Sequence, residues 1–316
     1  MLRGWLAVFR AWTARRDRGA ALRPGRADVR LVGTAMVLCC ALGVACARGV
    51  EPSERPEGAG ARGESGGPME DSSASSSAAA AEPDPREERR DPAPHADRPA
   101  FVELEVPGFL PAVVALPADW SRPRPALVAA HGAGDGARWQ CEMWRHLLAA
   151  RGFVLCPAGV PFGKDPEAGA FFRNHHELER EVLAALEALR EAYGDALAPG
   201  PLVYTGYSQG ATMGALMLVN HGDVFDRLVL VEGGYGEWNV SIAKRYGASG
   251  GQRVLFACGI RTCDTKARRS ADALRRAGLD ARVEYAEGAG HTYGGAVAEK
   301  VLMALDWVLE DDPRWR

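Results

Sequence analysis

One short stretch of the sequence has the residue types and spacing of a catalytic serine turn. Residues 206–210 read Gly-Tyr-Ser-Gln-Gly and lie between an apolar, strand-like run and a helix-like run. Glycines two residues to either side leave room for Ser208 to adopt the strained backbone that a strand-to-helix turn requires. The turn would present the Ser208 hydroxyl at a helix N-terminus, where the Gln209 amide can stabilise an oxyanion. We therefore predict that Ser208 is a nucleophile.

A second glycine-rich turn occurs earlier in the chain. Residues 131–135 (HGAGD) end the strand-like run 126–132. Glycines let the backbone approach a tetrahedral intermediate, so the Ala133 amide is the predicted second donor of an oxyanion hole. His131 is expected to hydrogen-bond within this loop rather than act as a base. The alternative, a phosphate-binding loop, is disfavoured because the sequence lacks the pattern G-x-x-x-x-G-K-[ST].

A base and an acid are expected after the nucleophile in chain order. His291 follows the last strand-like run (281–287) and precedes the last helix-like run, which makes it the predicted base. Asp264 is the predicted acid because it is the only carboxylate between the strand-like run 253–259 and the helix expected after it. Glu232, at the end of the preceding strand-like run, is the alternative acid.

These segments together resemble the α/β-hydrolase serine esterases. Within that superfamily they resemble the phospholipase/carboxylesterase (acyl-thioesterase) and dienelactone-hydrolase-like groups. The resemblance spans about residues 120–310 and rests on the motifs HGAGD, GYSQG and GAGHTY and on the loop that carries Asp264. It implies that Ser208 attacks an acyl carbonyl, His291 transfers the proton and Asp264 orients His291. Two departures are a long acid loop and Glu232, where a neutral residue is more usual.

The positions of these residues require a layered α/β domain. Residues 101–316 alternate strand-like and helix-like runs after two opening strands. This order predicts an α/β-hydrolase fold, in which a mostly parallel central sheet carries helices on both faces.

The first hundred residues have a different composition. Residues 1–30 are rich in arginine and residues 31–47 carry no charge, so segment 1–47 is expected to be an export signal or a membrane anchor. Cys46 ends a stretch resembling a lipobox and is a candidate lipidation site. Residues 48–100 are expected to form a disordered tether, because residues 51–100 contain no Val, Ile, Leu, Phe, Tyr or Trp. The protein would be exported, to the cell envelope or beyond, with membrane contact only through its N-terminus.

The remaining predictions concern partners and cysteines. A net charge of −3 argues against nucleic-acid binding, and the chain is expected to be a monomer. The sequence shows no metal or cofactor motif. An exported protein favours disulfides, and we expect a Cys258–Cys263 bond around the acid loop. Cys141 and Cys156 would be a second pair or buried thiols.

The predicted substrate is a small or medium acyl ester. Four aromatic residues that follow strands are candidate pocket residues: Trp139, Phe162, Phe171 and Phe172. The leading hypothesis is a serine carboxylesterase that also admits thioesters. The alternatives are a non-catalytic binding module of the same fold and a peptidase that uses the same triad.

Overall fold

The computed structural model describes residues 99–164 and 168–316. The predicted export segment with Cys46, and the predicted tether up to residue 98, lie outside the described residues. The elements, in chain order, are β1 (Phe101–Leu104), β2 (Ala112–Ala115), β3 (Ala126–Ala130), α2 (Ala137–Leu147), β4 (Phe153–Cys156), β5 (Val160–Pro161), β6 (Ala170–Phe171), α3 (His175–Tyr193), β7 (Leu202–Tyr207), α4 (Gln209–Met217), β8 (Phe225–Val231), α5 (Val240–Ala248), β9 (Arg253–Cys258), α6 (Arg261–Arg276), β10 (Asp280–Tyr285) and α7 (Gly295–Val308).

The central sheet of the described part has eight strands in the order β1-β2-β4-β3-β7-β8-β9-β10. Neighbours from β4 to β10 are parallel, and β1 and β2 pair antiparallel at one edge. The predicted mostly parallel sheet with two opening strands is therefore confirmed. The chain order changes direction between β3 and β7, and open α/β sheets usually bind ligands at such a switch point, beyond the carboxyl ends of the strands.

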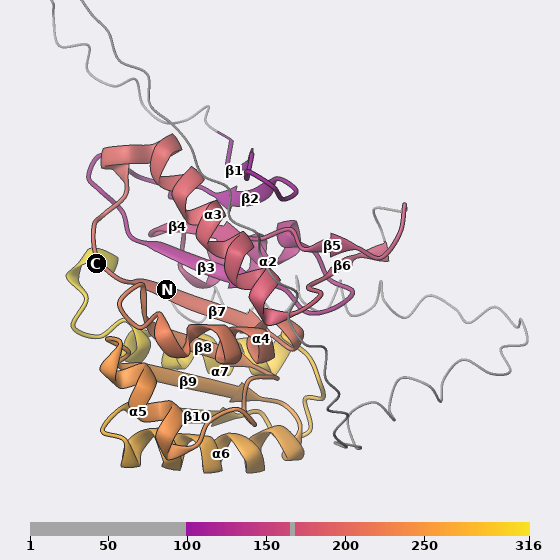
Figure 1. Ribbon diagram of the computed structural model, residues 1–316, viewed down its shortest axis with the longest axis vertical. Helices are drawn as coiled ribbons and strands as arrows, with labels where there is room; N and C mark the ends of the chain where they lie inside the picture. Colours follow the sequence, from indigo (N-terminus) through magenta and orange to yellow (C-terminus); the bar gives the residue numbers. More distant parts are fainter. Residues whose placement is uncertain (1–98, 165–167) are drawn as a thin grey trace, which may run out of the picture. The chain divides into compact units, whose positions relative to one another are not determined.

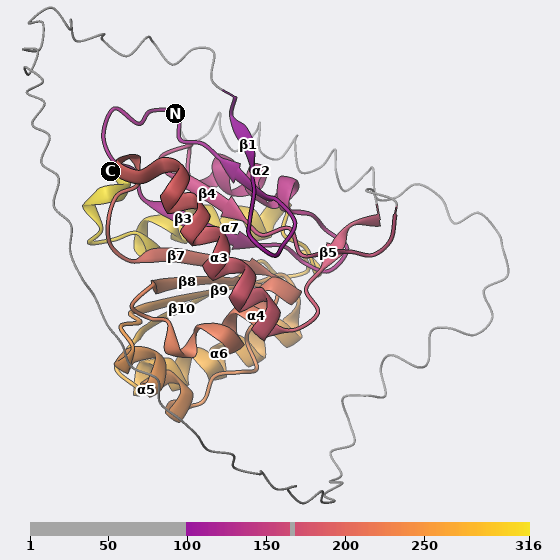
Figure 2. The same cartoon turned by 45° about the horizontal axis from the view of Figure 1, so that its top comes forward.

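Helices cover both faces of the sheet, as predicted. Successive residues of a strand point to opposite faces. In β3, Ala126 and Val128 pack into a core formed with α3, α4, α5 and α6, whereas Leu127 and Ala129 pack into a core formed with α2 and α7. Figures 1 and 2 both show α3 crossing in front of the strands. Burial on both faces explains why β8 and β9 are nearly continuous apolar runs.

A small residue sets the close approach of α4 to the sheet. A Cβ atom at Gly214 would lie 2.2 Å from the ring of Tyr204 in β7. The helix that follows the predicted nucleophile can therefore pack close to its own strand only because position 214 has no side chain.

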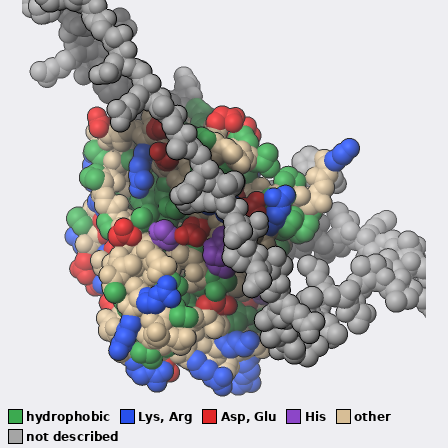
Figure 3. Space-filling view, viewed as in Figure 1, with side chains coloured by type: hydrophobic (Ala, Val, Ile, Leu, Met, Phe, Trp, Pro, Cys, Tyr) green, Lys and Arg blue, Asp and Glu red, His purple; other side chains and the backbone are tan. Residues whose placement is uncertain are grey.

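Basic side chains gather on the surface over α5 and α6 (Figure 3). Figure 3 shows Lys and Arg side chains over α5 and α6 at the lower end of that view.

Within residues 99–164 and 168–316, no helix combines the length and apolar character needed to cross a bilayer.

Candidate active site

The turn at Ser208 connects β7 directly to α4. Ser208 has φ 49° and ψ −105°, a backbone conformation that non-glycine residues rarely adopt. A Cβ atom at Gly206 would lie 2.4 Å from the Ala211 nitrogen, and one at Gly210 would lie 2.5 Å from the Ala130 oxygen. The two glycines of the GYSQG motif are therefore required by close backbone contacts, as the sequence predicts.

The Ser208 hydroxyl faces an imidazole. Its Oγ atom lies 2.9 Å from Nε2 of His291, in the loop between β10 and α7. The Tyr207 hydroxyl donates a hydrogen bond of 3.1 Å to the His291 carbonyl, and the two rings lie 5.5 Å apart. Tyr207 therefore helps to hold the histidine loop, a role that the sequence analysis did not assign to it. The sequence signal that could have indicated this role is the position of Tyr207 next to Ser208 in the GYSQG motif.

The second imidazole nitrogen faces Glu232. His291 Nδ1 lies 3.0 Å from Oε2 of Glu232, whose side chain is fully buried. Oε1 of the same carboxylate accepts hydrogen bonds from the Gly259 amide and, at 3.2 Å, from the Ile260 amide. These amides lie at the N-terminus of α6, where the helix dipole favours a negative charge. A carboxylate in this position favours the tautomer with the proton on Nδ1, which leaves Nε2 free to accept the serine proton.

The structure does not bring Asp264, the first-choice acid, into contact with His291. Helix α6 already begins at Arg261, and Asp264 lies in its first turn. Its carboxylate pairs with Arg268, with Asp264 Oδ1 2.8 Å from Nη2 and Oδ2 3.1 Å from Nε. The long loop expected between β9 and α6 is only a short turn at Gly259 and Ile260. The backbone amides of these two residues face Glu232. The alternative named from the sequence, Glu232, is the carboxylate that contacts His291.

A local signal for Glu232 was present in the sequence. Glu232 directly follows β8, has φ 53° and precedes Gly233. A Cβ atom at Gly233 would lie 2.2 Å from the Ser208 carbonyl oxygen. The pair Glu-Gly at a strand end thus marks a second strained turn packed against the serine turn.

The described residues form two disulfides, one of which is the predicted Cys258–Cys263 bond. Cys258–Cys263 closes the turn that contains the Gly259 and Ile260 amides. Cys141–Cys156 joins α2 to β4. The first bond braces the backbone that holds the Glu232 carboxylate, although it was expected to brace Asp264.

The two candidate oxyanion donors belong to adjacent backbone segments. The Gly210 amide, in the first turn of α4, donates a hydrogen bond of 3.2 Å to the His131 carbonyl. This bond ties the loop that carries Ala133 to the helix that begins with Gln209. Neither the Ala133 amide nor the Gln209 amide donates a hydrogen bond to another described residue.

His131 has the structural role that its sequence position suggested. Its ring is buried, with Nδ1 2.8 Å from the Gly132 oxygen and Nε2 3.1 Å from the Ala158 oxygen. Burial lowers the pKa of His131, while its contacts with the Gly132 and Ala158 carbonyls act to raise it. The ring links two loops and does not reach the serine–histidine pair through any contact in the described residues.

The four candidate pocket aromatics have different environments. Phe172 is only 2% exposed and its ring centre lies 4.6 Å from that of His131, so its side chain packs in the core. Phe162 is 54% exposed and stacks on Phe171 with a ring separation of 4.7 Å. Trp139 makes edge contacts with Tyr207 and with Tyr293. Three of the four therefore remain candidates for substrate contact.

The described residues include no cluster of three or more His, Cys, Asp or Glu side chains that could hold a metal ion.

Comparison with known proteins gives structural relatives only. No family model and no curated protein matches the sequence. FphF, a fluorophosphonate-binding serine hydrolase of Staphylococcus aureus, is 15% identical and aligns with a TM-score of 0.51 over 67% of this chain and 98% of its own. Est1E from Butyrivibrio proteoclasticus is 12% identical and aligns with a TM-score of 0.50 over 67% of this chain and 98% of its own. Identities this low establish the fold alone.

Proposed function

We propose that this chain, which has the α/β-hydrolase fold, is a serine hydrolase that cleaves carboxylic esters or thioesters through an acyl-enzyme. The observation that carries the proposal is the continuous chain of contacts from Ser208 Oγ to His291 and from His291 to Glu232, at 2.9 and 3.0 Å. Nucleophile, base and orienting acid are each within hydrogen-bond reach, as covalent acyl transfer requires.

The first half-reaction would acylate the serine. Ser208 Oγ attacks the acyl carbonyl carbon while His291 Nε2 takes the hydroxyl proton. The carbonyl π electrons move to oxygen, and the amides of Ala133 and Gln209 stabilise the resulting oxyanion. Glu232 stabilises the imidazolium that forms. Collapse of the intermediate breaks the bond to the leaving group, and His291 returns its proton to the departing alcohol or thiol.

The second half-reaction would regenerate the enzyme. A water molecule attacks the acyl-serine while His291 accepts one of its protons, and a second oxyanion forms at the same two amides. Collapse of this intermediate releases the carboxylic acid, and the proton on His291 returns to Ser208 Oγ.

The backbone strain at Ser208 supports this assignment. A φ of 49° is costly for a serine and is maintained here by close glycine contacts on both sides. A non-catalytic binding module would need no such turn, and it would not need a buried carboxylate bonded to an exposed histidine. The strained turn and the buried carboxylate therefore favour an enzyme over the binding-module alternative.

The test uses short esters and a covalent probe. Purified protein is expected to hydrolyse p-nitrophenyl acetate and butyrate and to react with a fluorophosphonate. Ser208→Ala should abolish both signals. Ser241→Ala, the same change at an exposed position in the first turn of α5, is the matched control and should retain both. Ester hydrolysis at the wild-type rate in Ser208→Ala would refute the proposal.

We further propose that the domain is exported and held at the membrane by its N-terminal segment. Two disulfides in one domain support an oxidising compartment. Fractionation of cells that express the full chain and a Cys46→Ser variant tests the lipid anchor. Release of the variant into the soluble envelope fraction is expected, and retention of the variant in the membrane would contradict lipidation at Cys46.

A further inference from the structure

The segment 170–172 lies against the loop that carries Ala133. The Gly134 amide donates a hydrogen bond of 2.9 Å to the Ala170 oxygen, and the Ala170 amide donates one of 2.8 Å to the Asp135 oxygen. A Cβ atom at Gly169 would lie 2.2 Å from the Gly134 oxygen. The two backbones can approach this closely only because position 169 has no side chain, and β6 fixes the position of the loop on this side.

The same segment is held from the other side by the Gln209 side chain. Gln209 Oε1 accepts a hydrogen bond of 2.8 Å from the Phe172 amide, and Gln209 Nε2 donates one of 3.0 Å to the Phe172 carbonyl. One side-chain amide thus satisfies both backbone groups of one residue, as a neighbouring strand would. The Phe172 ring is buried against His131, which anchors this end of the segment in the core.

The two candidate oxyanion donors are thereby attached to one piece of backbone. Ala133 directly precedes Gly134, which bonds Ala170, and Gln209 bonds Phe172 through its side chain. We propose that the Gln209 side chain is a positioning residue that sets the spacing of the two oxyanion amides by clamping segment 170–172. The inference rests on the proposed serine hydrolase function and assigns to that site a residue role beyond the main-chain amide of Gln209.

The expected effect is on the transition state. Amide donors stabilise an oxyanion only when they are fixed where its charge develops, and the ground-state carbonyl gains much less from them. Loosening the clamp should therefore lower kcat and leave KM for a short ester nearly unchanged. Loss of one oxyanion donor typically costs about 10²–10³-fold in kcat, so displacement of a donor should cost less, roughly 10- to 100-fold.

The first variant removes both side-chain bonds at similar length. Gln209→Met should lower kcat roughly 10- to 100-fold for p-nitrophenyl butyrate, with KM within about threefold. The matched control is Gln252→Met, at an exposed position next to β9, which should retain wild-type kcat. Thermal unfolding of both variants checks that the fold is kept.

The second variant makes the clamp depend on pH. In Gln209→Glu, an ionised carboxylate can accept from the Phe172 amide but repels the Phe172 carbonyl, whereas a protonated carboxyl can accept from one group and donate to the other. The ratio of variant to wild-type kcat should therefore rise as pH falls from 7 to 5. The ratio for Gln209→Met should stay flat. A ratio that is equally flat for Gln209→Glu would contradict the clamp, because a merely structural role would not follow the protonation of this one group.

Amide hydrogen exchange separates this inference from the proposed function. Gln209→Met should speed exchange at Phe172, Ala170 and Gly134, whose amides the clamp holds directly or through the paired segment. Unchanged exchange and unchanged kcat in this variant would overturn the inference while active wild-type enzyme upholds the hydrolase. A wild-type protein with neither ester hydrolysis nor probe labelling would overturn the hydrolase, and with it the role given to the clamp.

Discussion

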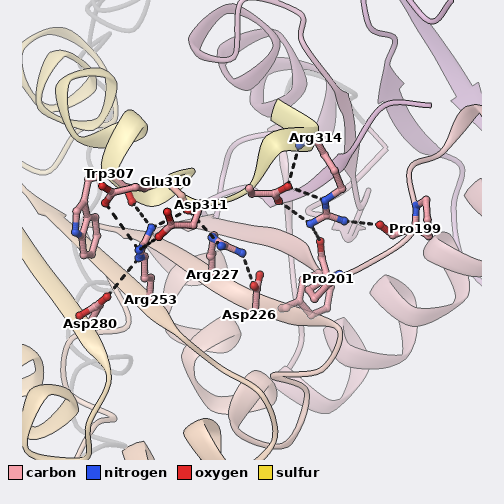
Figure 4. A network of polar contacts seen from close by, with 12 residues as sticks. Pro199, Pro201, Asp226, Arg227, Arg253, Asp280, Trp307, Glu310, Asp311 and Arg314 are labelled. Carbon is pink, nitrogen blue, oxygen red and sulfur yellow. Dashed lines mark hydrogen bonds and ion pairs between the residues drawn. The ribbon is translucent and has the colours of Figure 1, made fainter. Parts of the chain in front are cut away.

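The two ends of the parallel strands use carboxylates and nitrogen donors in opposite ways. At the carboxyl ends, Glu232 faces a histidine and two backbone amides. At the amino ends, arginines bond carboxylates and carbonyl oxygens, and these bonds tie the C-terminal segment to the rest of the domain (Figure 4). Arg314 bonds both carboxylate oxygens of Asp312 and the carbonyls of Pro199 and Pro201.

At the amino ends of the strands, arginines anchor the chain segment that follows α7. Arg253 donates to the carbonyls of Trp307 and Glu310, both at 2.9 Å, and pairs with Asp311 at 3.1 Å. Arg227 forms a buried pair with Asp226 and contacts the Glu310 carbonyl at 3.4 Å. These bonds satisfy carbonyl groups that the end of α7 leaves without helical partners.

The two ends differ in whether the side chain that faces the carboxylate can gain and lose a proton near neutral pH. A guanidinium keeps its proton under all ordinary conditions, so an arginine–carboxylate contact fixes geometry and transfers nothing. An imidazole can gain and lose a proton near neutral pH, so a histidine between a carboxylate and a hydroxyl can perform chemistry. The carboxylate contacts have similar lengths at the two ends. An arginine partner makes such a contact an anchor, whereas a histidine partner makes it part of the proposed active site.

The largest expected effect concerns the carboxylate behind His291. Glu232→Gln should lower kcat roughly 10³- to 10⁴-fold, because a neutral amide cannot stabilise the imidazolium and can favour the wrong tautomer. Asp264→Asn is the paired variant and should keep kcat within about twofold, since Asp264 contacts Arg268. Steady-state kinetics of both variants would reverse our assignment if Asp264→Asn lost more activity.

The next effect concerns stability at the opposite end. Arg314→Leu should lower the free energy of unfolding by about 2–4 kcal/mol, because the Asp312 carboxylate stays buried without its bidentate partner. Denaturant unfolding measures this loss. kcat should remain at the wild-type value at a temperature where the variant is folded, and a marked fall in kcat would show that the two ends are coupled.

A smaller effect separates the two disulfides. Replacing Cys258 and Cys263 by alanine should lower kcat about 3- to 10-fold, because the Gly259 and Ile260 amides lose the constraint that aims them at Glu232. The matched double variant at Cys141 and Cys156 should lower the free energy of unfolding by about 3 kcal/mol and leave kcat nearly unchanged. Equal loss of kcat in both double variants would contradict a specific role for the first bond.

The smallest expected effect is a pH dependence of stability. Burial acts to raise the pKa of Asp312, but the hydrogen bonds and charge of Arg314 outweigh it and lower the pKa below its usual range. This contribution is therefore present above the pKa of an unfolded aspartate, about 4, and is lost as pH falls through the lower folded value. Unfolding experiments between pH 6 and 3 should show a shallower decline for Arg314→Leu than for the wild type. Parallel declines would contradict the assignment.

Much of the fold and most of the proposed site could be predicted from the sequence. Apolar runs alternating with helical periodicity gave the parallel sheet, and the GYSQG motif gave the position and strain of Ser208. His291 followed from its position after the last strand-like run. These features are local, because a few adjacent residues decide where a strand ends, where a turn has a strained backbone and where a helix begins.

The carboxylate that contacts His291 could not be chosen in this way. Both Asp264 and Glu232 follow parallel strands, and chain order alone places either one at the same edge of the sheet. The choice depended on where α6 begins, since a helix that starts at Arg261 carries Asp264 away and turns its amides toward Glu232. A helix boundary is set by packing and by disulfide closure, and sequence patterns fix it only to within a few residues.

The sequence by itself determined which residues could do chemistry, because side-chain type and strand-end position are written in it. The tertiary structure alone decided which of them face one another. Contacts such as His291 with Glu232, Gln209 with Phe172 and Arg314 with Asp312 depend on distances and directions between segments. Such distances result from the packing of the whole core, and no local pattern carries that information.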